Sequence, residues 1–324
     1  MEYCSKLVGN QPIQRYLQKT IKNGTVANAQ LWLGPKHIGK STFLINYIFA
    51  LSCQRPSHAD KPCQSCSVCK ALQDEHYPNL RWVDAADKAI RVDSILEIRG
   101  NSSHTTLYPG PRVLVIENAD QLHPTGSNAL LKLLEEPTAG LYIFLLSSSP
   151  DIILTTIRSR CLVLNFSLAA PADVLASWSE VSLATIAITQ GLPGRIKLFQ
   201  QQPKLAAAWL KDIKNWLEIL AATSYSQRIQ LAQPWLVNEK SGQASLLNIL
   251  RSASILLRDI LQIQNENVSK VLLAQYTSEL EEIANKHSLA QTIYALSQIQ
   301  VIWKRQSTTP IQKKLVLSNF LLVI

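Results

Sequence analysis

The first half of the chain alternates short apolar runs with segments whose apolar residues recur at helical spacing. Four runs are expected to be strands: 29–33, 80–83, 113–116 and 142–146. The run at 113–116 is apolar at every position, which is typical of a strand buried on both faces. Between the runs, helices are expected at 41–51, 92–100 and 127–136. This order predicts an α/β domain with a mostly parallel sheet covered by helices.

The pattern changes after Phe166, where the strand-like runs stop and a short helical region begins. The tripeptide 201–203, Gln-Gln-Pro, separates this region from a final third with helical periodicity almost throughout. The clearest helices of that third are expected at 245–263, 271–286 and 289–303. We therefore predict three parts: an α/β domain at 1–166, a small helical lid at 167–204 and an all-α C-terminal domain at 205–324.

The composition narrows the class of protein. With 47% hydrophobic and 17% charged residues, the chain is expected to fold rather than to be disordered. No run approaches 18 consecutive apolar residues, so we expect no transmembrane helix. The first residues include Glu2 and lack an apolar core, so we expect no secretory signal and a cytoplasmic location. The net charge of +9 permits contact with nucleic acid without requiring it.

Residues 34–41, Gly-Pro-Lys-His-Ile-Gly-Lys-Ser, match the phosphate-binding pattern G-x-x-x-x-G-K-[ST]. In such a loop, backbone N–H groups surround phosphate oxygens, the lysine reaches the β and γ phosphates, and the hydroxyl ligates Mg²⁺. The apolar strand before the loop and the helix after it provide the context that the motif needs. We predict an ATP and Mg²⁺ site at Gly34, Gly39, Lys40, Ser41 and Thr42.

An acidic residue at the end of a buried strand is the usual partner of such a loop. Glu117 follows the run at 113–116 and is expected to face the metal. An active ATPase of this class usually has a second acid at the next position, where it activates the attacking water. That position is Asn118, whose amide cannot accept a proton at neutral pH. Asp120 lies close by, but it is two residues beyond the position where the second acid is expected. We therefore predict weak or absent ATP hydrolysis.

Four cysteines form a cluster that predicts a metal site. Cys63, Cys66 and Cys69 are spaced as C-x₂-C-x₂-C, and Cys53 lies ten residues before them. Four thiolates can close a tetrahedral Zn²⁺ site with no open position, so the zinc would be structural. A loop of free cysteines is the alternative, although two C-x-x-C units that share a cysteine argue against it. The insertion is expected at about 53–69.

Taken together, these motifs resemble the clamp-loader subunits of bacterial DNA polymerase III, which are AAA+ proteins. The strand, P-loop, helix and C-x₉-C-x₂-C-x₂-C pattern carry the resemblance, and residues 7–11 and 127–137 resemble further family segments. Residues 159–161, Ser-Arg-Cys, match the family's S-R-C motif. The resemblance implies that Arg160 is an arginine finger that completes the ATP site of a neighbouring subunit. It also implies that Ser148 is a polar sensor residue after the strand at 142–146.

Within this family, the chain resembles the delta-prime branch more than the gamma/tau motor branch. The Glu117–Asn118 pair departs from the acidic pair of the motor, and the sequence ends at Ile324 without the long tau tail. Gly194 stands where the motor has a sensor arginine, and Arg195 follows one position late. The resemblance implies a hetero-oligomer with gamma/tau and delta subunits that loads the sliding clamp onto primed DNA. The chain would then be part of a DNA-directed DNA polymerase assembly, a nucleotidyltransferase, without a polymerase active site of its own.

Two other interpretations stay open from the sequence. The chain could be an active gamma/tau-like motor ATPase, which fast DNA-stimulated hydrolysis would reveal. It could also be a zinc-dependent nucleic-acid-binding module with a vestigial P-loop, for which tight and salt-sensitive DNA binding would be evidence.

Overall fold

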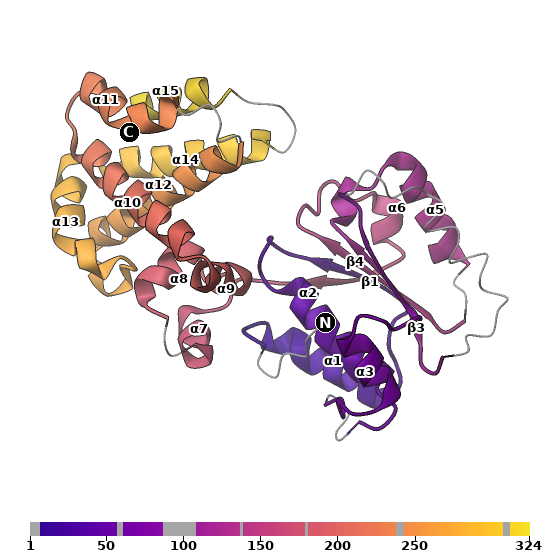
Figure 1. Ribbon diagram of the computed structural model, residues 1–324. Coiled ribbons are helices and arrows are strands. Elements are labelled where there is room, and N and C mark those ends of the chain that lie inside the picture. The colour runs from indigo at the N-terminus through magenta and orange to yellow at the C-terminus, as the bar shows by residue number, and fades with distance from the viewer. Residues whose placement is uncertain are drawn as a thin grey trace. The chain divides into compact units, whose positions relative to one another are not determined.

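The computed structural model describes residues 7–56, 61–86, 108–136, 139–178, 181–237, 243–306 and 312–324. The chain separates into two compact units (Figure 1). The first contains Met1–Ser177 together with Leu192–Gly194, and the second contains Trp178–Gly191 together with Arg195–Ile324. The predicted three-part division with boundaries at 166 and 204 stays a prediction. The helix expected at 92–100 lies outside the described residues.

The first unit is built on a five-stranded parallel sheet in the order β2-β3-β4-β1-β5. The strands are β1 (Ala29–Leu33), β2 (Leu80–Asp84), β3 (Arg112–Glu117), β4 (Leu141–Ser147) and β5 (Leu162–Asn165). The α/β prediction and the four predicted strands are confirmed. Because the strands are parallel, their carboxyl ends share one edge: Leu33 pairs with Ser147, and Asp84 pairs with Glu117.

Helices cover both faces of this sheet (Figure 1). One face packs against α1 (Gln11–Asn23), α2 (Lys40–Ser52) and α3 (Ser67–Gln73), with Trp32 and Phe144 in its core. The other packs against α5 (Pro124–Glu135) and α6 (Thr155–Arg158), with Leu31 and Leu114 in its core. Leu31 and Trp32 therefore serve opposite cores, as the strand pleat requires. The unit also contains the 3₁₀ turn η2 (Ala119–Gln121) and α7 (Pro171–Ser177).

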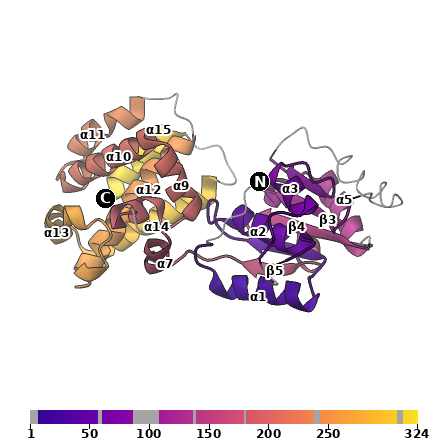
Figure 2. The same cartoon turned by 60° about the horizontal axis from the view of Figure 1, so that its bottom comes forward.

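The second unit is helical, as predicted. Its helices are α8 (Leu183–Thr189), most of α9 (Pro193–Gln201), α10 (Pro203–Ala221), α11 (Tyr225–Val237), α12 (Gln243–Gln264), α13 (Thr277–Lys286), α14 (Leu289–Gln306) and α15 (Lys313–Val323). The long helix α12 lies between α10 and α14 (Figures 1 and 2). The fully buried Trp216 of α10 donates from Nε1 to the Ile249 carbonyl of α12 at 2.8 Å. No helix in the described parts of the chain has the length and apolar character to span a membrane.

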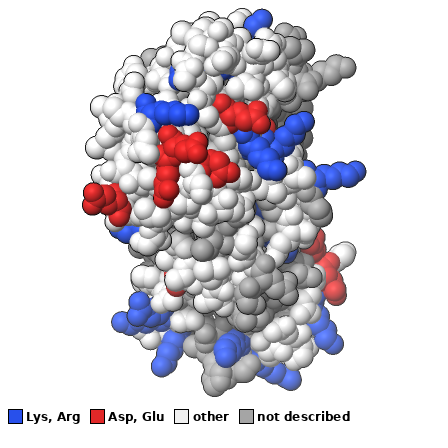
Figure 3. Space-filling model, turned by 90° about the vertical axis from the view of Figure 1, so that its left-hand side faces the viewer, with Lys and Arg blue, Asp and Glu red and all other residues white. Residues whose placement is uncertain are grey.

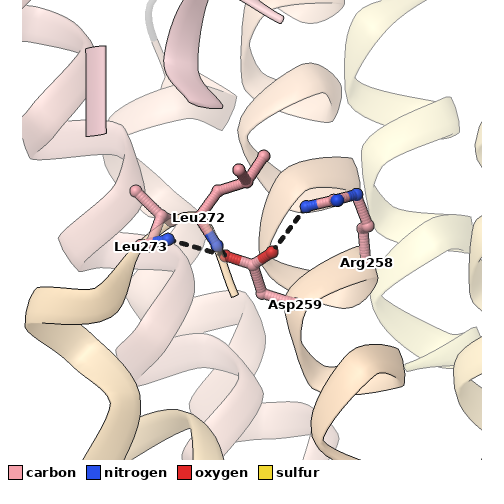
Figure 4. A network of polar contacts seen from close by, with 4 residues as sticks. All are labelled: Arg258, Asp259, Leu272 and Leu273. Carbon is pink, nitrogen blue, oxygen red and sulfur yellow. Dashed lines mark hydrogen bonds and ion pairs between the residues drawn. The ribbon is translucent and has the colours of Figure 1, made fainter. Parts of the chain in front are cut away.

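The helix predicted at 271–286 is wrong in its first part, because α13 begins only at Thr277. The 3₁₀ turn η4 (Ala274–Tyr276) lies in that part instead, and a second 3₁₀ turn, η3 (Val268–Lys270), ends just before it. The buried Asp259 of α12 explains the difference: its Oδ2 accepts hydrogen bonds from the backbone N–H groups of Leu272 and Leu273 at 3.1 and 2.9 Å (Figure 4). A carboxylate that takes these donors competes with a helical turn for them.

Candidate functional site

The P-loop connects β1 to α2 and lines a pocket of about 500 Å³ in the first unit. Most of the predicted nucleotide-binding residues meet there. The pocket is lined by Lys36, His37, Gly39, Lys40, Ser41, Thr42, Glu117, Asn118, Leu146, Ser147, Ser148 and Gly194. Gly34 is not among these residues, although its carbonyl accepts a hydrogen bond from Lys40. The sheet explains the convergence, since β1, β3 and β4 all end at this edge.

The side chain of Lys40 folds over the loop from which it comes. Its Nζ donates to the carbonyls of Gly34 at 2.6 Å and of Pro35 at 3.0 Å. Burial lowers the pKa of Lys40 from 10.5 to about 8, while the charges of Asp120 and Glu117 oppose that shift. A phosphate group would supply the negative charge that this partly desolvated ammonium lacks.

Glu117 is held by two donors from other elements. Ser41 Oγ donates to Glu117 Oε1 at 2.9 Å, and the indole Nε1 of Trp82 donates to Oε2 at 3.1 Å. Trp82 lies on β2 opposite Val115, which makes Glu117 its diagonal neighbour on the adjacent strand. The Ser41 hydroxyl and the Glu117 carboxylate are hard oxygen donors of the kind that Mg²⁺ prefers. The sequence analysis missed Trp82, because the order of strands is not visible in the sequence.

Asn118 does not offer a group that could activate water. Its backbone is left-handed, with φ 50° and ψ 43°, a conformation that asparagine tolerates better than most residues. Its Nδ2 donates to Oδ1 of Asp84, at the end of β2, at 2.7 Å. The side-chain amide of Asn118 is therefore directed at the end of β2, where it acts as a hydrogen-bond donor.

Asp120 does not replace the missing acid either. Its Oδ1 accepts hydrogen bonds from Ser147 Oγ at 2.8 Å and from the Ser148 backbone N–H at 3.3 Å. Asp120 thereby fixes the end of β4 and the start of the segment that carries the predicted sensor residue Ser148. Among the described residues that line the pocket, Glu117 is the only one with a carboxylate.

Gly194 contacts the P-loop closely through its backbone. Its N–H donates to the His37 carbonyl at 2.9 Å. A Cβ atom at position 194 would lie 3.0 Å from that carbonyl oxygen and 3.2 Å from the His37 Cα. A side chain would therefore press on the loop backbone. This contact gives a physical reason for glycine at the position where the motor subunits have an arginine.

The four predicted metal ligands come together in one cluster. The sulfur atoms of Cys53, Cys63, Cys66 and Cys69 all lie within 4.8 Å of one another, and those of Cys53 and Cys63 are 3.6 Å apart. A tetrahedral zinc ion with Zn–S bonds of about 2.3 Å separates its sulfur ligands by about 3.8 Å, so the donor set fits Zn²⁺. Zn²⁺ held here would bind all four thiolates and serve a structural role.

Backbone N–H groups also favour thiolates in this cluster. The amides of Cys63, Cys66 and Cys69 donate to the sulfur atoms of Cys53, Cys63 and Cys66 at 3.3, 3.3 and 3.4 Å. Hydrogen bonds from Ser65 and then from Cys66 lower the pKa of Cys63 to about 6. Since Cys53 follows α2 and Cys66 caps α3, a bound metal would join the ends of two helices on one face of the sheet.

Arg160 lies just after α6 and does not line the P-loop pocket. Its Nη2 forms an ion pair with Glu135 Oε1 at 2.9 Å, and its Nη1 donates to the Thr156 carbonyl at 3.1 Å. Both side chains of the ion pair are substantially exposed, at 39% and 51%. The guanidinium is therefore accessible from outside the unit.

The parallel sheet with helices on both faces, with a P-loop between the inner strand β1 and α2, defines an AAA+ P-loop domain followed by a helical C-terminal region. Among solved structures, a gamma-subunit-related protein of Thermotoga maritima covers 95% of this chain and 97% of its own length. Its TM-score is 0.43 and its sequence identity to this chain is 15%.

Sequence similarity identifies the family. Residues 9–169 match the family described as DNA polymerase III, delta subunit. The delta-prime subunit of Pseudomonas aeruginosa is 36% identical over 137 residues, which are 42% of each chain. That of Bacillus subtilis is 25% identical over 291 residues, 86% of this chain and 84% of the relative. The Bacillus subtilis tau subunit is 30% identical over 175 residues, 54% of this chain and 31% of tau. The chain belongs to the clamp-loader family of DNA polymerase III, among the relatives of delta-prime.

Proposed function

We propose that this chain is the delta-prime subunit of a DNA polymerase III clamp loader. In this role it joins gamma/tau and delta subunits in a cytoplasmic hetero-oligomer that loads the sliding clamp onto primed DNA. Its relatives named delta-prime support the role, and the Bacillus subtilis relative is similar over most of both chains. The match to the Pseudomonas aeruginosa relative spans less than half of that protein, so the activity of the whole assembly is part of the proposal.

The chain binds ATP with Mg²⁺ and hydrolyses it slowly or not at all. The observation that carries this proposal is the pair Glu117–Asn118 at the end of β3. Glu117 accepts a hydrogen bond from Ser41, whereas the amide of Asn118 donates to Asp84. No second carboxylate stands among the described residues of the pocket to take a proton from water. ATP would then act as a ligand that stabilises the subunit.

Nucleotide affinity and phosphate release by the purified chain test this point. We expect ATP binding that is lost in Lys40→Ala, and phosphate release close to the rate without protein. Lys70→Ala, which changes an exposed lysine outside the pocket, is the matched control and should bind ATP normally. Release at the rate of a motor subunit by the wild type at saturating ATP would contradict the proposal and support the gamma/tau-like alternative.

Arg160 acts in trans on the ATP site of an adjacent motor subunit. In the free chain it is paired with Glu135 on the surface, and exposed pairs of this kind contribute only about 0–1 kcal/mol. Leaving Glu135 for a γ-phosphate therefore costs little. A guanidinium offers a planar set of donors that matches a phosphoryl group in its transition state.

The test is reconstitution with the gamma/tau and delta subunits, the sliding clamp and primed DNA. We expect Arg160→Ala to lower the ATPase and clamp-loading rates while the complex still assembles. Arg158→Ala, an exposed arginine two positions earlier, is the matched control and should leave both rates unchanged. An assembly that loses nothing with Arg160→Ala would rule out the trans role.

Zinc has a structural role at the four cysteines. Metal analysis of the purified chain should find one zinc ion, and Cys66→Ser should lose it and unfold at a lower temperature. Cys161→Ser is the control, since this cysteine lies outside the cluster. Retention of the ion in Cys66→Ser would contradict the assignment of the ligands.

A further inference from the structure

Two arginines of the helical unit are partly buried without a carboxylate partner among the described residues. Arg195 lies in the first turn of α9, and no hydrogen bond or ion pair within the described part of the chain involves its guanidinium. Arg251 lies on α12, where its Nη1 donates to Oδ1 of Asn248 at 3.2 Å. The Nε of Arg251 is buried and has no partner among the described residues. A buried donor without an acceptor calls for an explanation.

The two charges also act on each other. Burial lowers the pKa of Arg195 to about 10. Burial, and after it the charge of Arg195, lower the pKa of Arg251 to about 10. Both groups remain charged at neutral pH. Like charges that share a desolvated region destabilise a fold unless a counter-charge joins them.

A third arginine of the same unit shows how such a group can be satisfied without an anion. Arg228 of α11 also has its pKa lowered by burial. Its Nε and Nη2, however, both donate to the Ala222 carbonyl, at 3.2 and 3.1 Å. Among the residues that the structure describes, neither Arg195 nor Arg251 donates to such a carbonyl, so partial burial alone does not account for them.

We propose that Arg195 and Arg251 form a binding site for a small phosphate-type oxyanion inside the helical unit. The guanidinium fork matches the oxygens of a phosphate, and the unpaired Nε of Arg251 supplies a donor for it. Two positive charges suit the roughly double negative charge of a phosphate group better than the single charge of a carboxylate. The anion could be free phosphate or the phosphate end of a nucleotide, because the site chemistry is the same for both.

Neither Arg195 nor Arg251 is among the described residues that line the P-loop pocket. The inference does not depend on a clamp-loader role or on ATP binding at the P-loop. The proposed anion site also gives Arg195 a role other than that of a γ-phosphate sensor.

The test is thermal unfolding of the full chain in the Lys40→Ala background, which removes the response of the P-loop to phosphate. Inorganic phosphate and ADP are titrated in parallel, with NaCl adjusted to keep the ionic strength constant. We expect the unfolding temperature to rise and then saturate with at least one of the two. A response to phosphate alone or to both identifies a free anion as sufficient, and a response to ADP alone identifies a nucleotide phosphate.

Three further variants assign the response. In the Lys40→Ala background, a second substitution, Arg195→Met or Arg251→Met, should abolish the saturable rise in the unfolding temperature. Arg228→Met in the same background should leave that rise unchanged. Without added anion, Arg195→Met should unfold at the same temperature as its parent or a higher one, because one of two like charges is gone. A flat titration with both ligands would overturn the proposal. So would a lower unfolding temperature of Arg195→Met without anion, since a carboxylate of the chain itself would then be the partner.

Discussion

Trp82 donates from its indole Nε1 to the Oε2 atom of Glu117 at 3.1 Å, across the gap between two parallel strands. Ser41 occupies the other carboxylate oxygen at 2.9 Å. Both oxygens of the Glu117 carboxylate are therefore held in place by donors of the chain itself. Its supporting residue comes from β2, an element that does not carry the nucleotide motifs.

Removing the indole donor should weaken binding of ATP only when Mg²⁺ is present. We expect Trp82→Phe to lower the affinity for Mg²⁺–ATP about tenfold, since a hydrogen bond to a charged group contributes about 1.5 kcal/mol. Affinity in EDTA should stay the same, because Glu117 then has no metal to hold. Titration of ATP with and without Mg²⁺ checks this, and equal losses in both conditions would point to a general disturbance of the sheet.

Nucleotide affinity should fall as the pH rises above about 8. The ammonium of Lys40 must be charged to bind phosphate, and its pKa is lowered from 10.5 to about 8 in the free chain. Affinity should therefore be full below that pH and decline above it. Lys36→Ala should keep the decline and move its midpoint slightly upward, because the charge of Lys36 helps to lower this pKa. Dissociation constants measured between pH 7 and about 9.5 test the expectation, with unfolding followed in the same buffers.

A methyl group at position 194 should disturb the P-loop. We expect Gly194→Ala to weaken ATP binding and to destabilise the fold by about 1–3 kcal/mol, the usual cost of overpacking. Gly126→Ala is the matched control, since a Cβ there meets only the Leu122 side chain at 3.5 Å. That variant should be neutral or more stable, because alanine favours the interior of α5. Comparable losses in both variants would show that the contact with His37 is not the cause.

The buried Asp259 should matter far more than its charged neighbour. Asp259→Ala leaves the N–H groups of Leu272 and Leu273 without an acceptor, so we expect a loss of about 2–4 kcal/mol in the free energy of unfolding. Arg258→Ala should cost about 0–1 kcal/mol, because the Arg258 side chain is 42% exposed. Denaturant titrations followed by far-UV circular dichroism compare the two. A larger loss for Arg258→Ala would contradict this assignment.

Local patterns in the sequence predicted four of the five strands, the P-loop and the cysteine cluster, but not β5. Such features depend on residues close together in the chain, as in the apolar run at 113–116 or the spacing of Cys63, Cys66 and Cys69. The net charge of +9 permits contact with nucleic acid, but the sequence does not locate a surface for it. Figure 3 shows both signs of charge over one side of the molecule, with basic side chains prevailing toward its lower end.

Features that depend on neighbours far apart in the chain could not be predicted. The contact of Trp82 with Glu117 requires the strand order, and the bond of Asp120 to Ser147 requires the register between β3 and β4. The misplaced start of α13 has the same origin, because periodicity does not reveal that Asp259 takes the amides of Leu272 and Leu273. Each of these features depends on a tertiary contact, and such a contact can override a local preference.

The left-handed backbone at position 118 would make an acid hard to introduce there. A glutamate introduced there would have to adopt φ 50°, which asparagine tolerates and longer side chains adopt at a cost, and it would approach Asp84 with a like charge. Restoring an acid by a single substitution would therefore meet both backbone strain and repulsion. Under the proposed function, a return to hydrolysis would therefore need more than one substitution at this site.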